Sequence, residues 1–288
     1  MSSIKEVILL FKSQLSLLYD SREAESIATL TLIELTGFSN SRIKAFPEME
    51  LTEEQSVAIS LILNDLNTGK PLQYILGHTE FFGLPFKVNP SVLIPRPETE
   101  ELVEWVISTF NKAKHGSATL LDIGTGSGCI AISLKKNLPF LDVTAIDISP
   151  EALQTAKANA ELNNTEINFL AADILDPDLL TEPSKFDIII SNPPYVTQQD
   201  KLQMHQNVTN FEPHGALFVP EDDPLLFYRV IAEFALKHLK PAGLLFFEIN
   251  ENYGEQICDL LQNLHFDNIE LRKDLSGRDR MIKASFKP

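Results

Sequence analysis

The feature that most constrains this chain is an apolar run, Phe186–Ser191, that ends abruptly in Asn192-Pro193-Pro194-Tyr195. A run so rich in β-branched residues is typical of a parallel strand that is buried on both faces. Because two consecutive prolines have no N–H to donate and cannot continue a central strand, the chain must leave the sheet there. Open α/β sheets bind their ligands at the carboxyl ends of their strands. We therefore expect Asn192 and Tyr195, held by the rigid Pro-Pro pair, at the functional centre.

From residue 119 onward, apolar runs alternate with helical patterns. Strands are expected at residues 119–122, 142–147, 167–171, 186–191, 243–248, 267–271 and 281–286. Helices are expected at residues 129–136, 150–162, 224–239 and 253–264. Alternation of this kind predicts a mainly parallel sheet with helices on both faces. Since crossovers between parallel strands are right-handed, the expected fold class is α/β with a doubly wound, Rossmann-like sheet.

The part of the chain before this sheet has two different patterns. Residues 1–77 show the apolar spacing and helix caps of a small all-helical domain. Its helices are expected at residues 4–18, 20–37 and 52–69, with a shorter helix or turn near residues 42–46. Residues 78–96 predict a β-hairpin linker, and residues 97–288 form the remaining domain, which opens with a helix at Pro97. The helical domain fits either a packing role or a substrate-recognition role, and we favour recognition.

A glycine-rich loop follows the first strand of the sheet, just after Asp122. Its residues are Gly124, Thr125, Gly126, Ser127 and Gly128. Glycine lets a backbone turn tightly and approach a ligand closely. A dinucleotide fingerprint that begins at Gly124 would need a third glycine where this chain has Cys129. The spacing therefore argues against a nicotinamide oxidoreductase, although a glycine loop by itself is weak evidence for any ligand.

Acidic residues at the next two strand ends add to the evidence from the loop. Asp147, at the end of the second strand, is placed to accept hydrogen bonds from both ribose hydroxyls of an adenosine. Asp173, just past the third strand, can reach the adenine amino group, and Ile174 can pack on the ring. This set resembles the class I S-adenosylmethionine-dependent methyltransferases. The resemblance implies S-adenosyl-L-methionine as the cofactor and an antiparallel strand near the end of a seven-stranded sheet.

Asn192-Pro193-Pro194-Tyr195 resembles the motif of methyltransferases that modify planar amide or amino nitrogens. Such a nitrogen is a poor nucleophile because its lone pair is delocalised. The side-chain oxygen of Asn192 and the carbonyl of Pro193 can each accept one hydrogen of a substrate NH2 and so aim its lone pair at the methyl donor. Tyr195 can cover the flat group by stacking. Pro194 and Arg96 complete the expected substrate side, and Asn192 is expected to touch the cofactor as well.

Three substrate classes share this motif, namely adenine in DNA, guanine or adenine in RNA, and the glutamine amide in protein. The net charge of −16, from 24 basic and 40 acidic side chains, argues against a nucleic acid because it repels phosphates. An amino-group methyltransferase for DNA or RNA bases is thus the second hypothesis. A non-catalytic adaptor with a vestigial cofactor site is the third, which the intact motifs disfavour.

Over nearly its full length, the chain resembles the release-factor glutamine methyltransferases of the HemK/PrmC type. The segments that carry the resemblance, besides the helical domain, are residues 71–77, 96–100, 192–195, Glu212-Pro213 with Ala216-Leu217, and 274–280. It implies transfer of a methyl group to N5 of the glutamine in the Gly-Gly-Gln loop of peptide chain release factors, which are then the protein partner. The chain departs from the family pattern at residues 218–224 and at Asn250, where a glycine is usual.

Residues 197–223 form a long connection with little periodicity. Loops of this length inside compact domains are usually functional or disordered. We therefore expect part of the substrate wall, or a lid that excludes water. Glu212 and His214 lie within it, and we assign neither a catalytic role.

The remaining sequence features concern the location of the protein and its need for a metal. No run of about 18 apolar residues occurs, so we expect no membrane span. The first residues do not show the pattern of a signal peptide. Cys129, Cys258 and the six scattered histidines form no disulfide or metal-ligand pattern. We expect a cytoplasmic enzyme without a metal.

Overall fold

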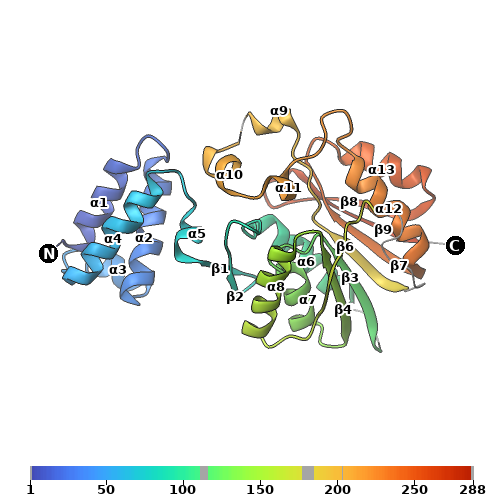
Figure 1. The fold of residues 1–288 in the computed structure, drawn as a ribbon, viewed down its shortest axis with the longest axis horizontal. Helices are drawn as coiled ribbons and strands as arrows, with labels where there is room; N and C mark the ends of the chain where they lie inside the picture. The colour runs from blue at the N-terminus through green and yellow to red at the C-terminus, as the bar shows by residue number, and fades with distance from the viewer. Residues whose placement is uncertain (1, 111–115, 177–184, 203, 287–288) are drawn as a thin grey trace. The chain divides into compact units, whose positions relative to one another are not determined.

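The computed structural model describes residues 2–110, 116–176, 185–202 and 204–286 of the chain (Figure 1). The chain divides into two compact units. The helical unit consists of Met1–Leu76 with Gln206–Phe211, and the sheet unit consists of Gly77–His205 with Glu212–Pro288. All named strands belong to the sheet unit.

The helical unit contains the predicted helices. They are α1 (Ile4–Gln14), α2 (Ser21–Thr36), α3 (Asn40–Ala45) and α4 (Glu53–Leu66), joined by α5 (Leu72–Leu76) and α10 (Gln206–Phe211). Ser3 and Thr52 begin α1 and α4 with capping boxes, and Gly37 ends α2 in the left-handed conformation. The apolar faces of α1 to α5 meet in a buried core that includes Phe11 and Leu63.

The sheet unit is built on a seven-stranded sheet, as predicted. Its strands are β3 (Ala118–Ile123), β4 (Leu141–Asp147), β5 (Asn168–Ala171), β6 (Phe186–Ser191), β7 (Leu239–Glu248), β8 (Phe266–Lys273) and β9 (Asp279–Phe286). Their order is β5-β4-β3-β6-β7-β9-β8. Neighbours from β5 to β7 pair in parallel, whereas β9 runs antiparallel to both β7 and β8. The antiparallel strand near one edge confirms the ending that the resemblance implied.

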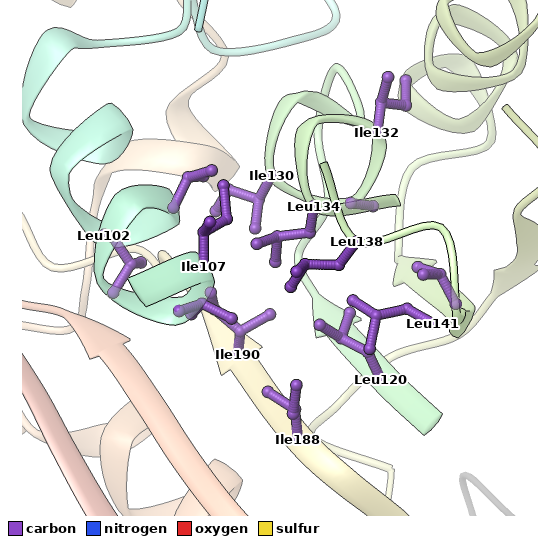
Figure 2. Close-up of a cluster of buried hydrophobic side chains, with 14 of the residues drawn as sticks. Leu102, Ile107, Leu120, Ile130, Ile132, Leu134, Leu138, Leu141, Ile188 and Ile190 are labelled. Atoms are coloured by element: carbon purple, nitrogen blue, oxygen red, sulfur yellow. The ribbon is translucent and has the colours of Figure 1, made fainter. Parts of the chain in front are cut away.

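Helices cover both faces of this sheet (Figure 1). They are α6 (Pro97–Phe110), α7 (Cys129–Asn137), α8 (Pro150–Leu162), α12 (Leu226–His238) and α13 (Gly254–Asn263). Successive residues of a strand point to opposite faces. Ile188 and Ile190 therefore join the core formed with α6 and α7 (Figure 2), whereas Ile189 joins the core formed with α12 and α13. A strand that is apolar on both faces must be central, which is the position of β6.

The predicted hairpin is formed by β1 (His78–Phe81) and β2 (Leu84–Lys87). Its turn residues, Phe82 and Gly83, have positive φ angles of 51° and 71°. The side chain of Asn159 in α8 bonds both the N–H and the carbonyl of Lys87, at 2.7 and 3.0 Å. These bonds fasten the hairpin to α8 within the sheet unit.

Two parts of the chain differ from the prediction. Residues 197–223, expected to lack regular structure, contain α9 (Gln198–Lys201), α10 and α11 (His214–Leu217). Each has only four to six residues, which is too short to show an apolar period. β7 begins at Leu239 rather than at residue 243. Pro241 and Ala242, the latter with a φ of 63°, interrupt the apolar pattern within this strand.

Candidate active site

A cavity of about 500 Å³ lies in the sheet unit, at the carboxyl ends of β3, β4, β5 and β6. The predicted site residues that line it are Arg96, Gly124, Thr125, Gly126, Ser127, Asp147, Asp173, Ile174, Asn192, Pro193 and Pro194. We name two parts of its surface. The glycine wall comprises residues 124–127 with Asp147, Asp173 and Ile174, and the proline wall comprises Asn192, Pro193 and Pro194 with Arg96 and Thr99.

The glycine wall depends on backbone conformations that favour glycine. Gly124 and Gly126 have positive φ angles of 73° and 55°. Apart from chain neighbours, no described atom lies within 4 Å of a Cβ placed on either residue, so a ligand can approach the backbone there. Gly128 has a different use, because a Cβ on it would lie 2.9 Å from Cδ1 of Ile132. It allows close packing at the start of α7 and does not line the cavity.

Two carboxylates stand on the glycine wall. Asp147 accepts hydrogen bonds from the backbone N–H groups of Gly126, at 2.8 Å, and Ser149, at 2.9 Å. Asp173 accepts one from the N–H of Leu175 at 2.9 Å. A carboxylate offers about four lone-pair sites to donors. Both groups are therefore fixed by the backbone and still able to bind a ligand hydroxyl or amino group.

A buried carboxyl group lies beneath the glycine wall. Asp122 is fully buried, and it accepts a 2.6 Å hydrogen bond from the hydroxyl of Thr125. Burial raises the pKa of Asp122 to about 7, an effect that the bond from Thr125 opposes and the charge of Asp147 reinforces. The bond closes the glycine loop onto the end of its own strand.

The proline wall carries the motif that follows β6. The amide nitrogen of Asn192 donates to the hydroxyl oxygen of Thr99 at 3.3 Å. That hydroxyl donates to Oε2 of Glu248 at 2.6 Å, and the phenol of Tyr195 donates to Oε1 of the same carboxylate at 3.0 Å. Tyr195 does not line the cavity, and its partly buried ring packs against the core formed with α12 and α13. The structure thus fixes Tyr195 through its hydroxyl.

Thr99 and Glu248 are site candidates that the sequence reasoning missed. Glu248 is 1% exposed and ends β7, the strand beside β6. An acidic residue at the end of an apolar strand is the signal that could have revealed it. Thr99 lies in the first turn of α6 between Glu98 and Glu100, where the acidic residues indicate a favourable interaction with the helix dipole. Neither pattern indicates that Thr99 and Glu248 meet.

Arg96 is held at the cavity by an ion pair. Its Nη2 lies 2.5 Å from Oε1 of Glu212, whose other carboxylate oxygen accepts a 3.2 Å bond from the N–H of Ile94. The side chain of Glu212 is 1% exposed. Burial raises the pKa of Glu212, and the charge of Arg96 opposes that rise. Glu212 therefore fixes the segment that carries Arg96.

Asn250, where the resemblance implies a glycine, fastens the chain that follows the motif. Its side-chain nitrogen donates to the carbonyl of Tyr195 at 3.1 Å and to the carboxylate of Asp200 at 2.9 Å. A glycine could make neither bond.

Cys129 has a packing role, since burial raises the pKa of its thiol to about 12 and keeps it protonated at neutral pH.

Among the residues that the structure describes, no group of three or more His, Cys, Asp or Glu side chains is placed to hold a metal ion. In the described parts of the chain, no helix is both long enough and apolar enough to cross a membrane.

Comparison with known protein families divides the chain in two. The PrmC N-terminal domain family matches residues 6–77, and the methyltransferase small domain family matches residues 103–219. The release factor glutamine methyltransferase of Flavobacterium psychrophilum is 47% identical over 96% of this chain and 97% of its own length. The protein of the same name from Bacteroides thetaiotaomicron is 41% identical over 93% of this chain and 95% of its own length.

A solved structure shares the fold. The 16S rRNA N2 G1207 methyltransferase of T. thermophilus, in complex with AdoMet and guanosine, matches 73% of this chain and 50% of its own. The two are 19% identical, and the TM-score is 0.53. At this level of identity, the likeness concerns the fold alone.

Proposed function

This chain belongs to the release factor glutamine methyltransferase family, and we propose that its cavity transfers a methyl group from S-adenosyl-L-methionine to the N5 amide nitrogen of a glutamine in a peptide chain release factor. Identity of 47% to the F. psychrophilum relative over 96% of the chain supports the proposal. One observation carries it. A single cavity joins the glycine wall and its two carboxylates to the Asn192-Pro193-Pro194 turn.

The residues of the glycine wall fit the methyl donor. Gly124 and Gly126 leave space beside the backbone, Asp147 can accept from ribose hydroxyls, and Asp173 can accept from the adenine amino group while Ile174 packs on the ring. All five residues line the cavity. When bound, the donor would supply a methyl group on a positively charged sulfur: as the nitrogen lone pair bonds to the methyl carbon, the carbon–sulfur bond breaks to leave a neutral thioether, and the nitrogen releases one proton.

The proline wall is suited to prepare the amide nitrogen. In our proposal, Oδ1 of Asn192 accepts one N–H of the substrate glutamine and the backbone carbonyl of Pro193 accepts the other. Both bonds shift electron density toward nitrogen and orient its lone pair. Electrostatic partners that are fixed in advance are worth about a hundredfold or more in kcat in other enzymes.

We assign the remaining residues of this side to substrate binding. Pro194, which lines the cavity, covers the flat amide, and Tyr195, whose ring does not line the cavity, supports this turn from behind. Arg96, fixed by its ion pair with Glu212, contacts the peptide that carries the glutamine, because a guanidinium donates directed hydrogen bonds to carbonyl oxygens.

We also propose that the helical domain, residues 1–77, recognises the release factor. Several large apolar side chains of this region are exposed, among them Leu17 at 96%, Leu61 at 63% and Val57 at 57%. Exposed apolar groups gain free energy when a partner covers them. These side chains belong to the helical unit, whereas the cavity lies in the sheet unit. In our proposal they bind the release factor and take no part in methyl transfer.

Methyl transfer with purified components tests the proposal. The chain is incubated with methyl-labelled S-adenosyl-L-methionine and, in separate reactions, with a peptide chain release factor, RNA or DNA, and mass spectrometry then maps the label. We expect one methyl group on the side-chain nitrogen of the Gly-Gly-Gln glutamine. The control is a release factor in which alanine replaces that glutamine. Label in RNA or DNA would favour the nucleic-acid hypothesis, and no label in any substrate would favour the adaptor hypothesis.

A further inference from the structure

The carboxylate of Glu248 lies behind the proline wall and is not part of the cavity surface. It is 1% exposed, and each of its oxygens accepts a hydroxyl hydrogen bond, from Thr99 at 2.6 Å and from Tyr195 at 3.0 Å. A charge buried this deeply is costly unless it is hydrogen-bonded or paired. The two hydroxyl groups are therefore held as donors toward Glu248.

The direction of these bonds decides how Asn192 is oriented. A threonine hydroxyl has one proton to donate. Because Thr99 donates that proton to Oε2 of Glu248, its oxygen can only accept from Asn192. Asn192 thus turns its NH2 group toward Thr99, at 3.3 Å. Its Oδ1, the other branch of the same planar amide, remains available to a ligand in the cavity that Asn192 lines.

We propose that Thr99 and Glu248 are positioning residues that lock the amide of Asn192 with its oxygen toward the substrate nitrogen. The inference rests on the proposed function, because it concerns the acceptor for the glutamine NH2. An asparagine amide has nearly the same shape in its two flipped orientations, so packing alone does not choose between them. In the flipped orientation, the NH2 group of Asn192 would face the NH2 group of the substrate glutamine, and two donors cannot form a hydrogen bond with each other. The chain of hydrogen bonds from Glu248 through Thr99 makes the choice.

Groups from several elements interact with Glu248. Thr99, Tyr195, Arg280 of β9 and Glu98 of α6 act on its carboxyl group, and Glu248 in turn raises the pKa values of Tyr228 and Cys129. Burial raises the pKa of Glu248 and is the largest of these effects. The hydrogen bonds from Thr99 and Tyr195 and the charge of Arg280 oppose the rise, whereas Glu98 adds to it.

Protonation would disrupt this arrangement. A proton on Oε2 would make Glu248 a donor toward Thr99, and Thr99 could then donate to Asn192. That reversal favours the flipped amide, in which Oδ1 faces Thr99. Methyl transfer should therefore decline as pH falls through the pKa of Glu248.

Two substitutions of Thr99 test the inference. Thr99→Val keeps the shape of the side chain without its hydroxyl, and Thr99→Ser keeps the hydroxyl. We expect Thr99→Val to lower kcat on the release factor about tenfold or more, with the Kd of S-adenosyl-L-methionine and the KM of the release factor within about threefold of wild type. Thr99→Ser should retain most of kcat.

Equal kcat in Thr99→Val and the wild type would overturn the inference. Loss of activity in Thr99→Val without rescue in Thr99→Ser would also overturn it, since the lost element would then not be the hydroxyl. Failure of the wild type to methylate a release factor would instead overturn the proposed function. The two failures are therefore distinguishable.

A pH profile gives a test that does not depend on the folding of Thr99 variants. Tyr195→Phe removes a hydrogen bond that lowers the pKa of Glu248. The acidic limb of kcat in Tyr195→Phe should therefore lie at higher pH than in the wild type. A limb at the same pH in both proteins, or a wild-type profile without an acidic limb, would contradict the inference.

Discussion

Each wall of the cavity has a buried carboxyl group behind it, and each of these groups accepts a 2.6 Å hydrogen bond from a threonine. Behind the glycine wall, Thr125 and Asp122 are three positions apart, whereas Thr99 and Glu248, behind the proline wall, are 149 positions apart. The first bond closes a loop onto its own strand. The second joins helix α6 to strand β7 beside the motif. It leaves the hydroxyl oxygen of Thr99 as the acceptor for the NH2 group of Asn192. The same chemical pair thus shapes a binding loop in one place and orients a proposed catalytic side chain in the other.

This difference leads to separate expectations for the two walls. Changes in the glycine wall should weaken binding of the methyl donor and leave the chemical step intact. Changes in the proline wall should slow the chemical step and leave donor binding largely intact. The Kd of the donor measures the first kind of effect and kcat measures the second, so the two kinds can be distinguished.

The largest effect is expected in the proline wall. Asn192→Ala removes the proposed acceptor for the glutamine NH2 and should lower kcat about a hundredfold or more. Calorimetry should give a Kd for S-adenosyl-L-methionine within about threefold of wild type. Unchanged turnover would contradict the role assigned to Asn192.

A smaller effect of the opposite kind is expected in the glycine wall. Asp147→Asn removes a charged acceptor for ribose hydroxyls and should weaken donor binding about tenfold to a hundredfold, with kcat at saturating donor within about threefold of wild type. Asp142→Asn is the matched control, because Asp142 lies on the same strand, is exposed, and does not line the cavity. Equal weakening in both variants would refute a specific contact.

The buried group behind the glycine wall should make stability depend on pH. The pKa of Asp122 rises from 3.8 to about 7 on folding, so between these values the folded chain binds more protons than the unfolded chain. Its contribution is complete below the lower value and is lost as pH rises to the upper one. The free energy of unfolding should fall by on the order of 4 kcal/mol over that window.

Urea unfolding at several pH values measures this dependence. Asp122→Asn cannot titrate, so its free energy of unfolding should be flatter across the same window than that of the wild type. Curves that stay parallel for the two proteins would show that Asp122 titrates at the same pH in the folded and unfolded chains.

The smallest effect is expected outside both walls. Leu61→Ser removes an exposed apolar group of α4 and should raise the KM of the release factor about threefold to tenfold. Donor binding should not change. Leu162→Ser, at the exposed end of α8 in the sheet unit, is the control. A KM that stays at the wild-type value in Leu61→Ser would argue against this part of the helical surface as a docking site.

Local patterns in the sequence predicted most of the fold and the glycine wall. The isoleucine run of β6 is apolar on both faces because the strand is central, and it extends over the residues predicted for it. The glycines and Asp173 come shortly after a strand and Asp147 ends one, so the same local pattern indicates both the end of the strand and the site. Parallel strands then bring these ends to the same edge of the sheet.

The proline wall could be predicted only in part. Asn192 and Pro193 follow β6 and were visible in the sequence for that reason. The partners of this wall come from distant elements, since Thr99 lies on α6, Glu248 ends β7, and Glu212 reaches Arg96 from 116 positions away. Such pairs depend on strand order and helix packing, which no local pattern encodes. For the same reason, the assignment of α10 to the helical unit could not be read from its six residues.

The account is tested most directly by the rate of a single turnover on the release factor at saturating S-adenosyl-L-methionine, measured together with donor affinity in Asn192→Ala and Asp147→Asn. We predict that the rate is lost in Asn192→Ala and kept in Asp147→Asn, and that donor affinity shows the reverse. Equal loss of rate in both variants, or equal loss of donor affinity, would contradict the division of labour between the two walls.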